Sequence, residues 1–151
     1  MILRLRHGDV AQAGEHCAVD TNQIGDVSLG AVLTALCKAG KVVLLPWGAA
    51  QRYDLVIDDK GDFYRVQVKT GRLTRDGTAV IFRTANYVKG RFKHYQGEIE
   101  LFGVYCPETE RVYLVPVEHT RKMVCTLRLV PAKNGQKLRV HMADDYLLTM
   151  G

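Results

Sequence analysis

The sequence lacks the features that mark several common classes of protein. No apolar run approaches the roughly 18 residues that span a bilayer, and the opening "MILRLRHGDVAQAG" has too short an apolar stretch for a signal peptide. The four cysteines form no C-x-x-C pair, and there is no internal repeat, low-complexity tract or linker. We therefore expect a soluble, cytoplasmic protein with free buried thiols and no membrane partner.

The composition suits one globular domain. The chain has 151 residues, of which 47% are apolar. This is enough for one core, but two full domains would be cramped. The first twenty residues are irregular, with scattered glycines. We expect an N-terminal arm over residues 1–20 and a single domain over residues 21–151.

Negative charge is scarce in the second part of the chain. Residues 1–64 carry 6 Lys/Arg against 8 Asp/Glu, whereas residues 65–151 carry 15 against 8. Basic residues concentrated in this way are typical of a protein with an anionic partner such as nucleic acid. A basic soluble protein without such a partner is the plain alternative.

The chain predicts one helix followed by many strands. Asp20 or Thr21 can cap a helix that Gly40 ends, with apolar residues at helical spacing between them. Strand-like runs follow at 41–46, 53–57, 63–70, 78–84, 101–106 and 111–117, and again within 119–130; residues 138–148 close the chain as a strand with one helical turn. We expect a turn at 71–77 and a short helix or an extended loop at 85–100. This order indicates an α+β domain whose helix covers one face of a sheet.

Three polar residues stand out in the hairpin "RYDLVIDDKGDFYRVQVKT". Side chains alternate between the two faces of a strand. If Leu55 and Val66, and the apolar residues two positions further along each strand, enter the core, then Asp54, Gln67 and Lys69 converge on the opposite face.

Those three side chains have a chemical use together. A carboxylate and an amide oxygen can hold a hard cation such as Mg²⁺, and a lysine ammonium can stabilise charge that builds on a phosphate. These are the parts of metal-assisted phosphodiester hydrolysis. Polar residues that alternate along a half-exposed strand are also commonplace, so spacing alone leaves an ordinary hairpin with a wet face as the alternative.

The phrases around this hairpin resemble a known family. "YDLVID", a turn and "RVQVKT" look like the core motif of the PD-(D/E)XK nuclease superfamily. The closest resemblance is to the homing endonucleases linked to group I introns, in which the second acidic position is a glutamine. The "GD" pair that opens the helix, "GEIELFGVYCPETERVYLVPVE" and "TLRLVPAKNGQK" follow in the same order, so the resemblance covers about residues 22–148. It implies a restriction-endonuclease-like α+β core, with a helix packed on a mixed central sheet.

The resemblance also implies a role for each motif residue. Asp54 would be the metal-ligating aspartate, Gln67 would occupy the Glu/Asp position, and Lys69 would be the motif lysine. The backbone carbonyl of Val68 would also face the metal. The implied cofactor is Mg²⁺, with Mn²⁺ as the alternative.

One position departs from the family pattern. This branch tends to have a glutamate three residues after the aspartate of the "GD" pair, and that position here is Leu29. Asp26 lies one helical turn earlier on roughly the same face. Two interpretations stay open: Asp26 replaces the glutamate through a water or by a shift, or it is a favourable charge in the first turns of the helix.

A basic segment follows the motif directly. Cations are interleaved with the aromatics Tyr87, Phe92 and Tyr95, and only Asp76 opposes them between residues 72 and 93. We expect these cations to contact DNA phosphates: Arg72, Arg75, Arg83, Lys89, Arg91 and Lys93. The alternative is a solvated loop whose aromatic residues cover the core.

Together these features predict a Mg²⁺-dependent endonuclease that hydrolyses phosphodiester bonds of double-stranded DNA. With one active site per chain, cutting both strands requires a homodimer or a higher homo-oligomer. Three alternatives stay open: a junction-selective resolvase, a catalytically weak DNA-binding module, which Leu29 would favour, and a plain interaction domain.

Overall fold

A computed structural model describes residues 20–120, 123–131 and 140–149. Residues 1–19 of the predicted N-terminal arm lie outside the described part of the chain. Within that part, none of the helices combines the length and the apolar character that crossing a membrane would require.

The helix forms where its capping residues predict it. Helix α1 (Thr21–Lys38) begins after Asp20, whose side chain accepts a hydrogen bond of 3.0 Å from the backbone N–H of Asn22. It ends at Ala39, followed by Gly40 with a φ of 71°, the left-handed conformation that glycine adopts without strain. One face of α1 packs on a sheet through its buried residues Ser28, Val32 and Leu36.

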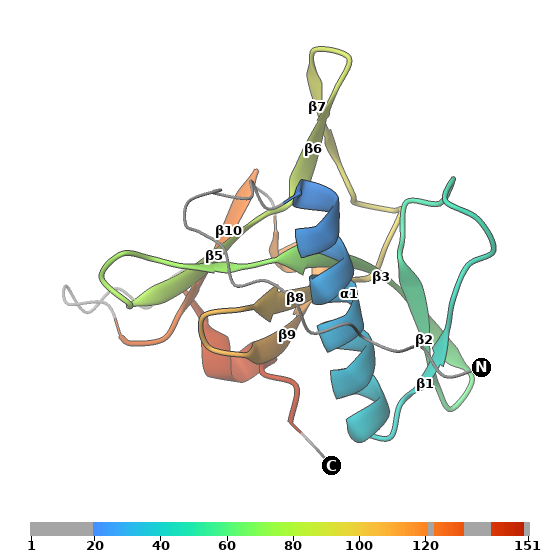
Figure 1. The fold of residues 1–151 in the computed structure, drawn as a ribbon, viewed down its shortest axis with the longest axis horizontal. Coiled ribbons are helices and arrows are strands. Elements are labelled where there is room, and N and C mark those ends of the chain that lie inside the picture. The colour runs from blue at the N-terminus through green and yellow to red at the C-terminus, as the bar shows by residue number, and fades with distance from the viewer. Residues whose placement is uncertain (1–19, 121–122, 132–139, 150–151) are drawn as a thin grey trace, which may run out of the picture.

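That sheet has five strands and is mixed, which confirms the predicted α+β architecture (Figure 1). Its order is β1-β2-β3-β8-β9, with bounds β1 (Val42–Leu44), β2 (Leu55–Asp59), β3 (Asp62–Thr70), β8 (Leu101–Cys106) and β9 (Arg111–Pro116). Strands β3 and β8 run parallel, and every other neighbouring pair is antiparallel. The predicted turn between β2 and β3 is also present, because Asp58 Oδ1 accepts a hydrogen bond from the N–H of Gly61.

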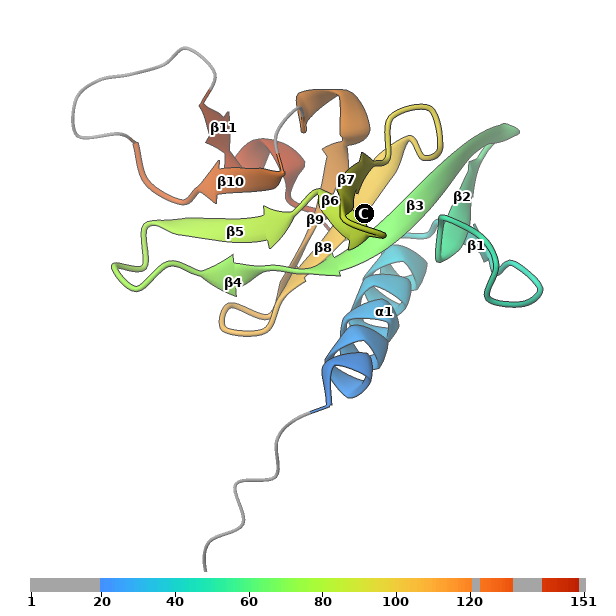
Figure 2. The ribbon, with the colours of Figure 1, turned by 90° about the horizontal axis from the view of Figure 1, so that it is seen from above.

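A second sheet flanks the first, with order β11-β10-β5-β4 (Figure 2). Its elements and the two short 3-10 helices are β4 (Arg72–Leu73), β5 (Ala79–Arg83), η1 (Val117–His119), β10 (Val124–Arg128), β11 (His141–Met142) and η2 (Ala143–Tyr146). Residues 72–73, expected in a turn, pair with β5 as a short strand. The segment 138–148, expected as a strand with one helical turn, contains the short strand β11 followed by η2; its first two residues lie outside the described ranges.

The prediction of a short helix or an extended loop for residues 85–100 was wrong. They contain a two-stranded hairpin, β6 (Ala85–Val88) and β7 (Arg91–His94), which projects at the top of Figure 1. Lys89 and Gly90 form its turn, with φ values of 47° and 78°. Positive φ at both central residues is the geometry of a tight hairpin turn, for which Asn-Gly is the usual signature. The sequence gave no such signal here, because Lys89 takes the first position of the turn and Ala85 is the one buried residue of the two strands.

The main sheet is covered on both faces. Under α1 lies one core, to which Leu55, Ile57, Val66 and Val68 contribute as the alternation predicted. The other core lies between the two sheets, where Phe102 and Val104 of β8 meet residues of the second sheet: Val80, Phe82, Cys125 and Leu127. The face that carries Gln67 and Lys69 is therefore partly enclosed and not simply wet.

The cysteines agree with the expectation in part. Cys37, Cys106 and Cys125 are free thiols. Cys106 and Cys125 are buried as expected, whereas Cys37 is exposed near the end of α1. Cys17 lies outside the described residues.

We predict that Gly71→Ala destabilises the fold. A Cβ at Gly71 would lie 2.7 Å from Cγ1 of Val80 and 3.0 Å from Cγ1 of Val104, both fully buried. Overpacking of this kind typically costs about 1–3 kcal/mol, which urea denaturation would measure as a lower free energy of unfolding.

Gly30→Ala is the matched control, because Gly30 is an exposed residue of α1 and nothing lies within 4 Å of a Cβ placed there. Alanine is the better helix former, so this variant should gain roughly 0.5–1 kcal/mol. A Gly71→Ala protein as stable as the wild type would contradict the packing described between the two sheets.

Candidate active site

The site forms where β2 and β3 part. The ladder between them ends at the pair Leu55 and Val66, and one further bond of 2.8 Å runs from the N–H of Asp54 to the carbonyl of Val66. Strand β3 continues to Thr70. The next N–H on this edge of β3, that of Val68, donates to the Asp54 side chain at Oδ2 over 2.7 Å. The carboxylate thus replaces the missing strand as the hydrogen-bond acceptor.

The side chain of Asp54, the backbone of Val68 and the side chain of Gln67 form a polar group that we call the fork. Nε2 of Gln67 donates to Asp54 Oδ2 over 2.5 Å and to the Val68 carbonyl over 3.3 Å, so the amide NH₂ lies between two oxygen atoms. A flip of the amide, which exchanges its oxygen and nitrogen, would place Oε1 where the NH₂ group now lies. The carboxylate of Asp54, the carbonyl of Val68 and the amide oxygen of Gln67 are then three oxygen donors, the ligand type that Mg²⁺ and other hard cations prefer.

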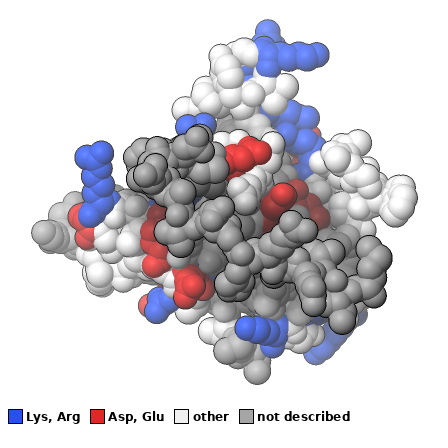
Figure 3. All heavy atoms as spheres, viewed as in Figure 1, with Lys and Arg blue, Asp and Glu red and all other residues white. Residues whose placement is uncertain are grey.

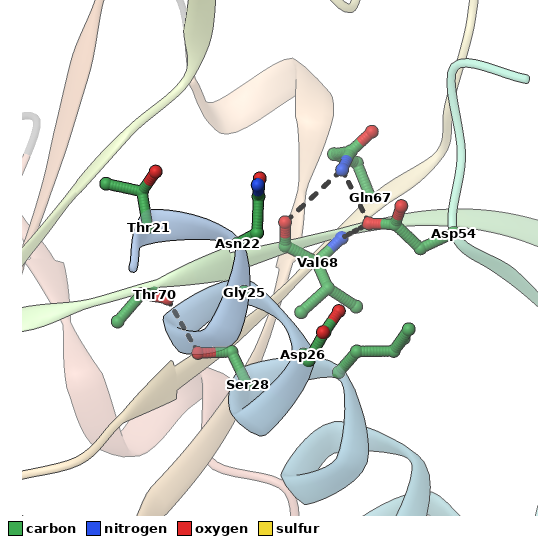
Figure 4. Close-up of a pocket in the computed structure, with 10 residues that line it drawn as sticks. Thr21, Asn22, Gly25, Asp26, Ser28, Asp54, Gln67, Val68 and Thr70 are labelled. Carbon is green, nitrogen blue, oxygen red and sulfur yellow. Dashed lines mark hydrogen bonds between the residues drawn. The ribbon is translucent and has the colours of Figure 1, made fainter. Parts of the chain in front are cut away.

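A pocket of about 290 Å³ opens between this fork and the start of α1. The fork contributes Asp54, Gln67 and Val68 to its lining, and the helix contributes Asp26 and Leu29, among others (Figure 4). A hydrogen bond of 2.6 Å between the hydroxyls of Ser28 and Thr70 joins α1 to the end of β3 at the edge of this pocket. The helix is therefore fixed beside the fork by a buried polar contact and by its apolar face.

The position of Asp26 bears on the interpretations left open by the sequence. Asp26 is exposed and lies on the α1 side of the pocket, across from Asp54 (Figure 4). It is the only acidic residue of α1 and lies beyond the first turn, where the helix dipole has little effect. Leu29 lines the same pocket but also packs on the core beneath the helix. The geometry therefore favours Asp26 as a second carboxylate of the pocket over Asp26 as a capping charge.

Lys69 lies beside the pocket and does not line it. Its Nζ donates to Asn86 Oδ1 over 3.2 Å and to the Tyr95 hydroxyl over 3.1 Å. In the described part of the chain it forms no ion pair within 4 Å. The structure thus brings Asp54, Gln67, Val68 and Asp26 together. Lys69 is held from the opposite side by Asn86 of β6 and by Tyr95, the residue after β7.

Partial burial disfavours the charge on both Asp54 and Lys69. Burial raises the pKa of the Asp54 carboxyl, although the N–H of Val68, the positive charge of Lys69 and the amide of Gln67 each oppose the rise. Burial likewise lowers the pKa of the Lys69 ammonium, which the charge of Asp54 opposes and that of Arg52 reinforces. Ionisable groups perturbed in this way beside a pocket are typical of functional sites.

All six cations expected to contact DNA are exposed: Arg72, Arg75, Arg83, Lys89, Arg91 and Lys93. They fall into two groups. One lies on β4, β5 and their turn. The other lies on hairpin β6–β7, where Lys and Arg side chains stand out at the top of Figure 3. Arg72 pairs with Glu108 over 3.8 Å and Lys93 with Glu98 over 3.0 Å, so these two are partly neutralised.

The aromatic residues of this segment fall into an exposed pair and one buried residue. Tyr87 and Phe92 are 66% and 53% exposed, and their rings contact each other edge to face on the hairpin with centroids 5.1 Å apart. They therefore do not cover the core, contrary to the alternative considered from the sequence. Tyr95, 1% exposed, does belong to the core, and its hydroxyl reaches Lys69. The contacts that Asn86 and Tyr95 make with Lys69 gave no signal in the sequence, because they depend on a hairpin that was not predicted.

Comparisons with known proteins bear on the family and the fold of the chain. A family profile described as PD-(D/E)XK endonuclease matches residues 19–149. Among solved structures, that of a bacterial homing endonuclease, I-Ssp6803I, is similar with a TM-score of 0.63 and 23% sequence identity, covering 85% of this chain and 86% of that one. No curated protein matches. The resemblance expected from the motif, and the restriction-endonuclease-like fold, are thus confirmed.

We predict that Asp54→Asn makes the free protein more stable at neutral pH. Since folding raises the pKa of Asp54, the folded chain holds its proton to higher pH than the unfolded chain. Stability is therefore lost as the pH rises from the ordinary carboxyl range through the raised pKa. An amide at this position avoids that loss and can still accept the hydrogen bonds of Val68 and Gln67.

Thermal unfolding with a chelator present would measure the effect at pH 7 and again in acid, where the advantage of the variant should shrink. Asp62→Asn is the control, because Asp62 is exposed at the start of β3, and such surface changes stay within about 0.5 kcal/mol. A melting temperature for Asp54→Asn below that of the wild type at pH 7 would contradict the electrostatic account of the fork.

Proposed function

The chain belongs to the PD-(D/E)XK endonuclease family, and we propose that it is a divalent-metal-dependent endonuclease acting on double-stranded DNA, similar to homing endonucleases. The observation that carries this proposal is the fork itself. Asp54 accepts the Val68 N–H, and the fork opens with the Gln67 amide onto a pocket that Asp26 also lines. Each motif residue has a place in the chemistry of phosphodiester hydrolysis.

The donors at the fork fit a single Mg²⁺ or Mn²⁺ ion. The carboxylate of Asp54, the carbonyl of Val68 and the Oε1 of a turned Gln67 amide would hold it, and Asp26 would add a carboxylate through a water. When bound, the ion supplies a Lewis acid for the phosphate and a polarised water as the nucleophile. The described residues contain no cluster of three or more His, Cys, Asp or Glu that could hold a metal, so waters and substrate phosphates would complete the coordination.

Lys69 contributes a positive charge beside this centre. Its ammonium is partly enclosed and faces two neutral acceptors, so its charge is not cancelled by an adjacent carboxylate within ion-pair distance. In a partly water-excluded setting such a charge stabilises an oxyanion more than it would in water. We assign to Lys69 the stabilisation of negative charge on the phosphate in the transition state.

The exposed cations supply binding to the DNA backbone. A two-stranded β-ribbon is narrow enough to enter the major groove, and hairpin β6–β7 carries Lys89 and Arg91 on such a ribbon, with the exposed pair Tyr87 and Phe92. The cations of β4 and β5 extend the basic surface. One pocket per chain can cut one strand, so cleavage of a duplex on both strands calls for a homodimer or a higher homo-oligomer.

One observation favours a second candidate function. Where the family branch tends to have a glutamate, Leu29 contributes an apolar side chain to the pocket. Among the described residues of α1, only Asp26 offers a carboxylate in its place. A chain with this pocket and the same basic surface could bind DNA while cutting it very slowly. Cleavage assays separate this candidate from the nuclease.

We predict that the wild-type protein nicks supercoiled plasmid with Mg²⁺ or Mn²⁺, and that Lys69→Met reduces the rate by about 10²–10³-fold, the usual effect of removing one group that stabilises an oxyanion. Asp54→Asn should remove activity in both metals. Retention of plasmid binding in a gel-shift assay would show that the loss lies in the chemical step.

Lys38→Met is the control for lost positive charge, because Lys38 is exposed in the last turn of α1, at the opposite end from the pocket. It should cut at the wild-type rate. If wild-type protein binds plasmid but never nicks it, with either metal, the nuclease proposal fails and the DNA-binding module takes its place.

We predict further that the metal binds tightly only when DNA is present. Asp54 is the one carboxylate directly at the fork, and a Mg²⁺ ion held by few protein ligands keeps several waters and relies on substrate phosphates. Titration calorimetry with Ca²⁺, used to prevent turnover, should give little heat with free protein and clear binding with a protein–DNA complex. Strong Mg²⁺ binding to free protein would contradict this.

A further inference from the structure

The base of hairpin β6–β7 closes around the motif lysine. Asn86 is the second residue of β6, and Tyr95 follows directly after the last residue of β7. Each provides one acceptor for Lys69 Nζ, at 3.2 Å from Asn86 Oδ1 and 3.1 Å from the Tyr95 hydroxyl. The two sides of one hairpin thus meet at a single ammonium group, although 17 and 26 residues separate them from Lys69 in the sequence.

Tyr95 is itself fixed by its surroundings. Its ring is buried and contacts Phe102 edge to face, with centroids 5.4 Å apart. The guanidinium of Arg52 lies 4.1 Å from the ring centroid, a cation–π contact. Arg52 also donates to the His94 carbonyl over 3.1 Å and pairs with Glu98 over 2.5 Å. Arg52, two residues before Asp54, therefore links the end of β7 to the segment that carries Asp54.

The chemistry of the two acceptors matters for Lys69. A lysine side chain has four rotatable bonds and about 2 kcal/mol of rotamer entropy, so a free ammonium would spread over many positions. An amide oxygen and a phenol oxygen limit this spread without cancelling the charge, as a carboxylate in an ion pair would. A charge that is both held and unneutralised is what stabilisation of a phosphate oxyanion requires.

We propose that Asn86 and Tyr95 are positioning residues that hold the ammonium of Lys69 beside the fork, and that hairpin β6–β7 is through them part of the catalytic apparatus as well as a DNA-binding surface. The catalytic part of this proposal rests on the proposed nuclease function; the holding of the lysine does not. The two parts are tested by separate measurements.

The holding of Lys69 can be measured in free protein without DNA or metal. Hydrogen-bonded lysine ammonium groups exchange their protons slowly enough to give a ¹H–¹⁵N signal, which for Lys69 is assigned by its absence in Lys69→Met. We expect this signal in the wild type and its loss or marked broadening in Tyr95→Phe, Asn86→Leu and the double variant. An unchanged Lys69 signal in the folded double variant would overturn the proposal, whatever the cleavage assay gives.

Tyr113→Phe is the matched control. Tyr113 is a fully buried tyrosine of the same core cluster as Tyr95, and its hydroxyl makes no hydrogen bond to Lys69. This variant loses the same atom from another buried ring of that core, so its Lys69 signal should be that of the wild type. Loss of the signal in Tyr113→Phe as well would mean that general loosening of the core is responsible, and would overturn the assignment to Tyr95.

The catalytic part is tested by single-turnover cleavage at saturating DNA. For the double variant we expect a rate lower by roughly 10–100-fold, as for other misplaced catalytic groups, with DNA affinity changed far less. Tyr113→Phe should keep the wild-type rate. A wild-type protein that does not cut refutes the nuclease function but leaves the ammonium signal to decide the holding of Lys69. A double variant that cuts at the wild-type rate refutes only the catalytic part of this proposal, the contribution of Asn86 and Tyr95 to the rate.

Discussion

The hydrogen bond from the Val68 N–H to the Asp54 carboxylate is the contact on which the site depends. It forms because β2 begins only at Leu55, the residue after Asp54, whereas its partner β3 runs on past Val66 to Thr70, leaving a backbone donor without a strand to receive it. The carboxylate satisfies that donor and is thereby held at the mouth of the fork. The same parting of strands directs the Val68 carbonyl outward beside it. One side chain thus satisfies the backbone of the sheet and also provides the carboxylate of the proposed cation site.

Two layers packed on the central sheet then give the fork its electrostatic character. Helix α1 covers one face, and the hydrogen bond between the Ser28 and Thr70 hydroxyls joins it to the end of β3 at the edge of the pocket. The second sheet and Tyr95 enclose the other face, where Lys69 lies. Because both layers remove water, the pKa of Asp54 is raised and that of Lys69 is lowered. The fold thus keeps two charges in a place where each is less favourable than in water, a cost borne by the rest of the core.

The sequence predicted those parts of the fold that obey local rules. The capped helix, the alternation that buries Leu55 and Val66, and the strands flanking the motif followed from caps and from periodicity, and the motif residues Asp54 and Gln67 meet where alternation put them. Hairpin β6–β7 escaped prediction because its turn begins with Lys89 in a conformation normally signalled by asparagine, and because Ala85 alone is buried in its strands, so that no alternation of apolar residues marks them. The contacts of Lys69 with Asn86 and Tyr95 could not be foreseen for the same reason, since they exist only once that hairpin has formed.

The departure at Leu29 acquires a physical meaning in this setting. An apolar residue at that position packs on the core beneath α1, which helps to fix the helix but leaves the pocket with Asp54 at the fork and the exposed Asp26 opposite. Fewer fixed carboxylates mean less mutual repulsion in the free protein and weaker attraction for a cation. The phosphates of a bound duplex would supply the missing negative charge. Under the proposed function, such a pocket would gain its full set of ligands only on the substrate, so that binding of the DNA and assembly of the reactive centre would be one event.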